Sequence, residues 1–300
     1  MPTTDLRLDE ANELLAAWVC ARADEHGIRA LIIKGRPLAD DGLRAARVSA
    51  DVDLLVEPAR FEQYCDALLD AGWQEFPSTF ASEHFTLHSR TYRKPGWPNS
   101  LDVHSEYPGF LRGPDAAFEA LWAGRRTSEF AHRACPVPSR AANALILALH
   151  SLRGTHRQSR HRDELDQVSR ASFSDRERAE LAALAAATGA SLPLRDLLAE
   201  WGVDVAVDPD LVGSPGELEW RRKTAEAQGA AASWWMLLRR APWRDKPEVV
   251  RRALWPSRDD FAKDHPEVPD RPWPQLQARV ARWGRGLRRA PAGLWALRRR

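Results

Sequence analysis

The stretch Arg47-Val-Ser-Ala-Asp-Val-Asp-Leu-Leu-Val56 decides the fold of the first half of this chain. Successive side chains of an extended strand point to opposite faces, so Asp51 and Asp53 share one face and the alternating apolar residues face a core. Two carboxylates held this close repel each other unless a cation lies between them. The pattern therefore favours a divalent-metal site over the plainer alternative, an amphipathic edge strand with two solvated acids.

A short apolar strand precedes this stretch and ends at a glycine, in Ala30-Leu-Ile-Ile-Lys34-Gly35. Backbone amides in a glycine loop near a helix start can hold phosphate groups. The loop therefore adds a candidate phosphate site to the candidate metal site.

A third carboxylate would complete a site for two metal ions, and Asp102 in Ser100-Leu-Asp-Val-His-Ser-Glu106 is the best candidate. The segment is a predicted strand whose residues Leu101 and Val103 face the core, so Asp102 shares its open side with His104. In two-metal sites the ions lie about 3.5–4 Å apart, one activating a hydroxyl and the other neutralising phosphates. Taken alone, Asp102 also fits a solvated strand acid.

The spacing of apolar residues and the positions of Gly and Pro predict both strands and helices up to about residue 138, and only helices after it. The order helix, strand, strand, helix, then further strands suits a mixed sheet covered by helices. Besides the acidic strand, we expect strands over residues 29–33, 73–76, 84–88 and 100–105. We expect helices over residues 8–26, 58–71, 115–123, 139–152, 160–171, 175–188, 191–201 and 217–240.

These elements suggest three parts. Residues 1–137 form a predicted α/β domain, residues 138–240 a predicted α-helical domain, and residues 241–300 a Trp-, Pro- and Arg-rich extension. Within the extension, Leu276 and Trp283 share one face of a predicted basic amphipathic helix. Such a helix can lie on an anionic membrane or dock onto its own domain. An arm for nucleic acid would lack any recognised motif.

Three motifs together resemble a known superfamily. Lys34-Gly35, Arg47-x-Ser49-x-Asp51-x-Asp53 and Leu101-Asp-Val-His104 are similar to motifs of nucleotidyltransferases related to DNA polymerase beta. More narrowly, they resemble bacterial nucleotidyltransferase family proteins with a Lys-Gly loop and an Asp-Val-His motif. The resemblance covers about residues 8 to 170 and is specific only for the combined pattern. It implies an α+β fold, a polymerase-beta-like mixed sheet with helices followed by an α-helical domain.

The resemblance also implies how the site works. Asp51, Asp53 and Asp102 would be catalytic and would hold Mg²⁺ (or Mn²⁺). The nucleotide phosphates would be bound by Lys34, Gly35, Arg36, Arg47 and Ser49.

The acceptor-side candidates are His104, His150 and Asp166. His104 shares the open side of its strand with Asp102, and residues 148–166 also resemble the helical segment that follows in such proteins. For His150 the alternative is a histidine satisfied within the core. For Asp166 the alternative is an ion pair on the helix surface.

One leading hypothesis and two alternatives remain. The leading hypothesis is an enzyme that transfers a nucleotidyl group from a nucleoside triphosphate to a hydroxyl of a small molecule, sugar or peptide. The first alternative is glycosyl or other group transfer from a nucleotide-linked donor, such as a nucleotide sugar, in natural-product tailoring. The second is an inactive binding or antitoxin-like module. It is favoured by the loop Gly35-Arg36-Pro37, where the superfamily usually has Gly-Ser or Gly-Gly.

Composition narrows the remaining classes. The net charge of +2 gives no general attraction to polyanions, and only five of the 44 basic residues are lysines, which indicates a sequence bias toward arginine. We therefore do not expect a nucleic-acid partner. The three cysteines are widely spaced and show neither zinc spacing nor a disulfide framework. No apolar run approaches the roughly 18 residues of a membrane span, so we expect a cytoplasmic protein, with the C-terminal basic helix as a candidate peripheral membrane contact.

Overall fold

The computed structural model describes residues 6–76, 89–154, 159–226, 241–257 and 273–284, and single positions between the last ranges. The chain forms two compact units. The first comprises residues 1–76, 88–152 and 160–220, and the second comprises residues 77–87, 153–159 and 221–300. The observed division falls at residue 220, inside a helix, and the domain boundaries at residues 137 and 240 remain predictions.

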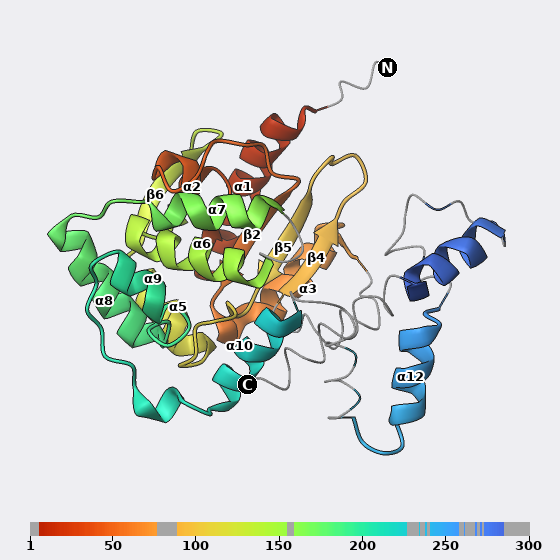
Figure 1. Ribbon diagram of the computed structural model, residues 1–300. Helices are drawn as coiled ribbons and strands as arrows, with labels where there is room; N and C mark the ends of the chain where they lie inside the picture. The colour runs from red at the N-terminus through yellow and green to blue at the C-terminus, as the bar shows by residue number, and fades with distance from the viewer. Residues whose placement is uncertain are drawn as a thin grey trace, which may run out of the picture. The chain divides into compact units, whose positions relative to one another are not determined.

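A mixed five-stranded sheet forms the centre of the first unit, as the sequence predicts (Figure 1). The strands follow the order β1-β2-β5-β4-β3, in which β2 and β5 are parallel and the other neighbours are antiparallel. The strands are β1 (Ala30–Ile33), β2 (Asp51–Val56), β3 (Gln74–Glu75), β4 (Ser89–Arg93) and β5 (Ser100–His104). A separate two-stranded sheet pairs β6 (Arg126–Phe130) with β7 (Arg133–Val137).

Helices cover the sheet, and most of them lie where periodicity places them. The helical bounds are α1 (Leu8–Glu25), α2 (Arg36–Asp40), η1 (Pro58–Arg60), α3 (Phe61–Asp70), α5 (Pro114–Ala123), α6 (Arg140–Gly154), α7 (Ser159–Ser169), α8 (Asp175–Thr188), α9 (Arg195–Glu200), η2 (Pro209–Leu211), α10 (Pro215–Glu226) and α12 (Lys246–Leu254). Local capping explains two of the starts. The Ser139 hydroxyl accepts a bond of 3.2 Å from the Ala142 N–H at the start of α6, and Ser174 forms a capping box with Glu177 at the start of α8.

Six elements were not predicted from the sequence: α2, β4, β6, β7, η2 and α12. The predicted strand over residues 84–88 lies outside the described residues. The predicted helix over residues 191–201 begins later, with α9, after a turn.

Alternation along β2 separates two hydrophobic clusters on the two faces of the sheet. Leu54 and Ile32 pack with α1 and α3 in one cluster. Leu55 and Ile33 pack with α5, α6, α8 and α9 in the other. Asp53 is two residues before Leu55, so its side chain lies on the face that the later helices cover. The helices after residue 138 therefore share a core with the sheet.

The second unit contains α12 and a helix over residues 273–284. The Trp283 indole donates to the Leu254 carbonyl at 2.6 Å, and the buried Arg279 guanidinium donates to the Pro256 carbonyl at 2.7 Å. Leu276 and Val280 remain 38% and 53% exposed. Arg279 of the basic face and Trp283 of the apolar face therefore both make internal contacts, and membrane contact stays a prediction. Among the described residues, no helix is long and apolar enough to cross a membrane.

Gly109 lies in a close contact within the first unit. Its φ is +103°, and a Cβ atom there would lie 2.5 Å from Leu149 Cδ2 and 2.9 Å from Trp220 Cζ3. Gly113 has a similar φ of +91°, but a Cβ atom there would meet nothing within 4 Å. Substituting Gly113 therefore tests the cost of positive φ alone, whereas substituting Gly109 tests that cost together with the cost of close packing.

We expect Gly109→Ala to lower the free energy of unfolding by more than Gly113→Ala does. Both substitutions place a side chain at positive φ, which costs about 1–3 kcal/mol. Only Gly109→Ala also forces overlap with core side chains, at about 1–3 kcal/mol more. Urea unfolding of both variants measures the difference. Equal losses of stability would contradict the close packing of α6 and α10 against Gly109.

Candidate functional site

The pairing of β2 with β5 decides where the predicted acids lie. Asp53 is the register partner of Asp102 on the parallel neighbour, so both side chains project to the same face of the sheet. His104 follows Asp102 by two residues and shares that face. A carboxylate oxygen of Asp53, one of Asp102 and a ring nitrogen of His104 all lie within 4.8 Å of one another. The sheet therefore brings two predicted metal ligands and one acceptor-side candidate together.

Asp53 is the most enclosed of these acids, at 6% exposed. Its Oδ1 contacts the Lys34 ammonium group and lies 2.9 Å from His104 Nε2. Burial penalises the charged form, but Lys34 and His104 outweigh that penalty and lower the pKa of Asp53 to about 2. Burial and, next, the charge of Asp53 raise the pKa of Asp102. The two neighbouring carboxyl groups therefore differ in how readily they ionise.

Asp51 lies at the start of β2, where Ser49 holds it. The Ser49 hydroxyl donates to Asp51 Oδ1 at 2.5 Å, and the Ser49 carbonyl accepts a bond of 2.8 Å from the Asn12 amide of α1. Buried Asn99 donates to Asn12 at 2.8 Å. This chain of bonds fixes the entry to the acidic strand. Asp51 and Asp53 both line one cavity, together with Val52 between them.

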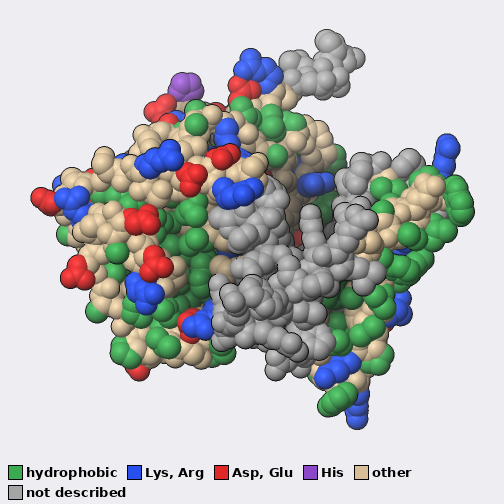
Figure 2. All heavy atoms as spheres, viewed as in Figure 1, with side chains coloured by type: hydrophobic (Ala, Val, Ile, Leu, Met, Phe, Trp, Pro, Cys, Tyr) green, Lys and Arg blue, Asp and Glu red, His purple; other side chains and the backbone are tan. Residues whose placement is uncertain are grey.

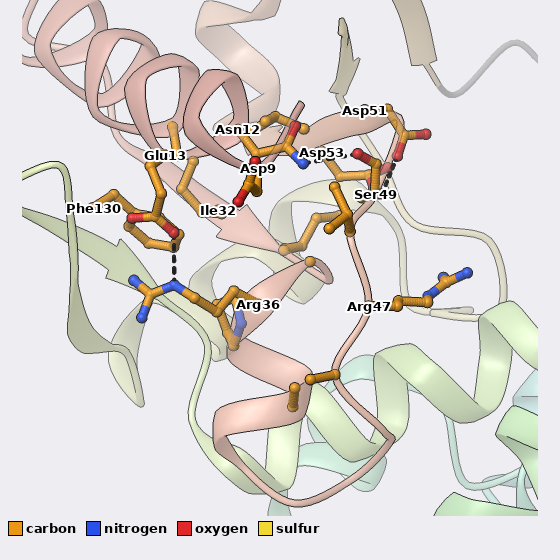
Figure 3. Close-up of a pocket in the computed structure, with 18 residues that line it drawn as sticks. Asp9, Asn12, Glu13, Ile32, Arg36, Arg47, Ser49, Asp51, Asp53 and Phe130 are labelled. Atoms are coloured by element: carbon orange, nitrogen blue, oxygen red, sulfur yellow. Dashed lines mark hydrogen bonds and ion pairs between the residues drawn. The ribbon is translucent and has the colours of Figure 1, made fainter. Parts of the chain in front are cut away.

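The cavity has a volume of about 380 Å³ and lies between α1, the start of α2 and the strand β2. Figure 3 shows Asp51, Asp53 and Ser49 grouped on one side, and Arg36, Glu13 and Phe130 on the other. Gly35, Ile32 and Val48 also line it. Asp51 and Asp53 thus lie on one wall, and the other side carries the Arg36–Glu13 ion pair beside apolar residues.

The glycine loop turns at two successive residues with positive φ, Lys34 at +61° and Gly35 at +58°. Gly35 lines the cavity and α2 begins directly after it. The Arg36 guanidinium is occupied: it pairs with Glu13 at 2.9 Å and Asp40 at 3.2 Å, and it donates to the Glu129 carbonyl. Arg36 therefore connects the glycine loop to α1 and to β6.

Arg47 reaches away from the acids toward the helices (Figure 3) and pairs with Glu164 of α7 at 2.9 Å. Arg44 pairs with the same Glu164 oxygen at 3.2 Å and donates to the Gly35 carbonyl at 2.8 Å. Burial opposes the charge of Glu164, but His161 and the two arginines lower its pKa. Glu164 thus connects α7 to both the glycine loop and the segment before the acidic strand.

The other acceptor-side candidates do not line the cavity with the acids. His150 packs edge to face against His161, with ring centroids 4.8 Å apart. Asp166 lines a different cavity, with Arg195 and Glu200 of α9. Of the predicted site residues, the cavity and the acid cluster thus include all except Lys34, His150 and Asp166. Lys34 contacts Asp53, and Arg47 lines the cavity but pairs with Glu164 of α7.

Sequence reasoning missed Glu164, Arg44 and Asn12. Glu164 carried a usable signal, because it shares a helical face with buried His161 and Val168. An acid on the buried face of a helix needs a charged partner. Arg44 and Asn12 carried no comparable pattern, since their partners are backbone groups and side chains far along the chain.

The acid cluster fits a divalent cation. Two carboxylates and an imidazole lie within 4.8 Å, whereas Asp51, on the same strand as Asp53, is not part of this group. Oxygen ligands of this kind suit Mg²⁺ and Mn²⁺. A second group within 4.8 Å among the described residues, His150, His161 and Glu164, fits less well. Its carboxylate already faces two guanidinium groups, so a metal ion there would meet like charge.

Three solved structures are similar to this chain at low identity. An antigenic nucleotidyltransferase-like protein from Paracoccidioides brasiliensis is 14% identical, with 69% of this chain and 98% of that chain covered and a TM-score of 0.40. The antibiotic-resistance factor ANT(2'')-Ia is 14% identical (63% and 98% covered, TM-score 0.42). The lincosamide antibiotic adenylyltransferase LnuA, lincomycin-bound, is 13% identical (53% and 95% covered, TM-score 0.35). These distant likenesses carry no argument about substrate.

No curated protein matches this chain. A family model described as "uncharacterised nucleotidyltransferase" matches residues 10–199, which include the sheet, the acid cluster and the helices up to α9. Since this match covers more than half of the 300 residues, the chain belongs to that family of nucleotidyltransferases.

Proposed function

We propose that this protein is an active enzyme that transfers a nucleotidyl group from a nucleoside triphosphate to a hydroxyl of a small molecule, sugar or peptide, with Mg²⁺ or Mn²⁺. The register of β2 against β5 supports this most, because it sets Asp102 beside Asp53. Asp53 in turn lines one cavity with Gly35 and Ser49. Neighbouring buried acids are costly, so a chain that had lost its activity gains nothing from keeping them.

In this proposal Asp51, Asp53 and Asp102 hold the metal. When bound, the metal neutralises charge on the phosphates and lowers the pKa of the acceptor hydroxyl. His104 orients the Asp53 carboxylate through its 2.9 Å hydrogen bond. Asp102, beside Asp53 on β5, would complete the ligands of the metal on the acceptor side.

The phosphates are assigned to the Gly35 side of the cavity, with Ser49, Lys34 and Arg47 around them. Arg47 has one ion-pair partner among the described residues, Glu164, and it shares that partner with Arg44. Two guanidinium groups against one carboxylate leave one positive charge unbalanced, which an anionic phosphate can balance. The Arg36 guanidinium is already occupied by two carboxylates, so we assign it to holding the loop.

The acceptor is assigned to the remaining cavity lining, which includes Ile32, Phe130 and Asn12. A nucleic-acid partner is not part of this proposal. Figure 2 shows acidic and basic side chains interspersed over α7 and α8 on the visible face of the first unit. A nucleic-acid surface needs a basic patch or stripe instead. A small hydroxyl-bearing molecule agrees better with a cavity of this size.

We expect Asp53→Asn and Asp102→Asn each to lower turnover by at least about 10²-fold, because each removes a charge that the transition state needs. The assay measures pyrophosphate release from a panel of nucleoside triphosphates, with Mg²⁺ and a panel of hydroxyl-bearing acceptors. Removing Mg²⁺ with a chelator should abolish the release.

Asp163→Asn is the matched control, since Asp163 is an exposed acid on α7 outside the cavity. Circular dichroism checks that each variant is folded. Near-normal turnover in either folded acid variant would contradict the assignment. Transfer from nucleotide sugars without pyrophosphate release would instead favour the glycosyl-transfer alternative.

We expect Arg47→Gln to weaken binding of a nucleoside triphosphate by about tenfold or more, the usual value of a charge-assisted hydrogen bond. Arg36→Gln, which also changes a cavity arginine, should weaken it by much less, since Glu13 and Asp40 hold that guanidinium. Isothermal titration calorimetry measures both dissociation constants. A larger loss for Arg36→Gln would place the phosphates on the other side of the loop.

A further inference from the structure

A positive charge already contacts one member of the acid cluster, Asp53. The Lys34 ammonium group contacts Asp53 Oδ1, and the two side chains are only 14% and 6% exposed. Asp53 is also one of the three groups whose ligand atoms lie within 4.8 Å of one another. Lys34 therefore neutralises the carboxylate that a divalent metal would use.

The backbone is bent to place Lys34 there. Its φ of +61° lies in the left-handed region, which residues with a Cβ atom rarely adopt. Two other described non-glycine residues have positive φ, Ala131 and His132, and both lie in the turn between β6 and β7. At Lys34 the strain follows a buried strand whose last residue, Ile33, is the register partner of Asp53. Strain that aims a charged side chain at an acid cluster points to a functional role.

Lys34 also adjoins the place assigned to the phosphates. Gly35, the next residue, lines the cavity together with Asp53 and Ser49. A lysine side chain is a long flexible stem with a compact charge, so small rotations can carry the ammonium group from one anion to another. The Lys34 ammonium group can therefore reach two anionic groups, the Asp53 carboxylate and the phosphates of a bound nucleoside triphosphate.

We propose that Lys34 is a tethered cation that competes with the divalent metal for Asp53 and transfers to the triphosphate when the nucleotide binds. This inference rests on the proposed function, and it adds that Lys34 regulates metal binding at the same site. Without nucleotide, the ammonium group repels an arriving metal ion. With nucleotide bound, the triphosphate draws Lys34 away, and Asp53 becomes available to the metal. Metal binding and nucleotide binding then strengthen each other, and by linkage the effect is reciprocal.

The test is a titration of the full-length protein with Mn²⁺, followed by the electron paramagnetic resonance signal of free Mn²⁺. We expect Lys34→Met to bind Mn²⁺ about tenfold more tightly than the unsubstituted protein when no nucleotide is present. A non-hydrolysable nucleoside triphosphate analogue should tighten Mn²⁺ binding in the unsubstituted protein by a factor within the usual coupling range, about 5- to 150-fold. The factor should be smaller in Lys34→Met, because Asp53 is already available.

Two further variants control the measurement. Lys94→Met removes a lysine whose ammonium group donates to the Ala71 carbonyl at 2.8 Å, away from the acids, and it should leave Mn²⁺ binding unchanged. Lys34→Arg keeps the charge and should keep the weak Mn²⁺ binding of the unsubstituted protein. If Lys34→Met fails to fold, Lys34→Gln replaces it, since its amide still donates to Asp53 without a charge.

The outcomes separate this inference from the proposed function. Equal or weaker Mn²⁺ binding by the folded neutral variant overturns the inference, because Lys34 would then be a structural ion pair that does not oppose the metal. Absence of Mn²⁺ binding in the unsubstituted protein, even with the triphosphate analogue, overturns the metal-dependent function itself. Tighter Mn²⁺ binding in the neutral variant together with a smaller coupling factor supports both.

Discussion

The parallel pairing of β2 with β5 is the constraint on which the rest of the site depends. A parallel register puts Asp53 directly opposite Asp102 and leaves their side chains on the same face. A shift of one residue would turn Asp102 to the opposite face and expose its buried neighbours, Leu101 and Val103. The same apolar alternation that stabilises the sheet therefore fixes the acid cluster, and the chemistry of the site depends on the register of the core.

Placing charges on a half-buried face requires partners, and the chain supplies them from nearby elements. Lys34 and His104 hold Asp53 in its charged form, although burial opposes it. Ser49 satisfies Asp51 at the open end of the strand. Each partner is itself fixed: Lys34 by the strained turn after β1, and Ser49 by Asn12 of α1. A carboxylate cluster without these partners would protonate or turn toward water.

The helices after residue 138 contribute more than cover for the sheet. α7 presents Glu164, at 4% exposed, to Arg44 and Arg47, and Arg44 in turn binds the Gly35 carbonyl. One buried carboxylate thus holds the segment between the glycine loop and the acidic strand. The helical part of the chain therefore determines the shape of a loop that precedes it by more than a hundred residues, a separation of 120 between Arg44 and Glu164.

The sequence by itself determined the mixed α+β class, the strand that carries Asp51 and Asp53, and the position of helices such as α8, because period-two alternation and helical periodicity act locally. It did not reveal the hairpin of β6 and β7, whose turn uses Ala131 and His132 at positive φ in place of glycine or asparagine. Tertiary structure alone decided that Lys34 faces Asp53 and that Arg47 faces Glu164. The sequence around each of these residues does not indicate its ion-pair partner. An ion pair between distant parts of the chain depends on where the folded backbone brings the two charges together.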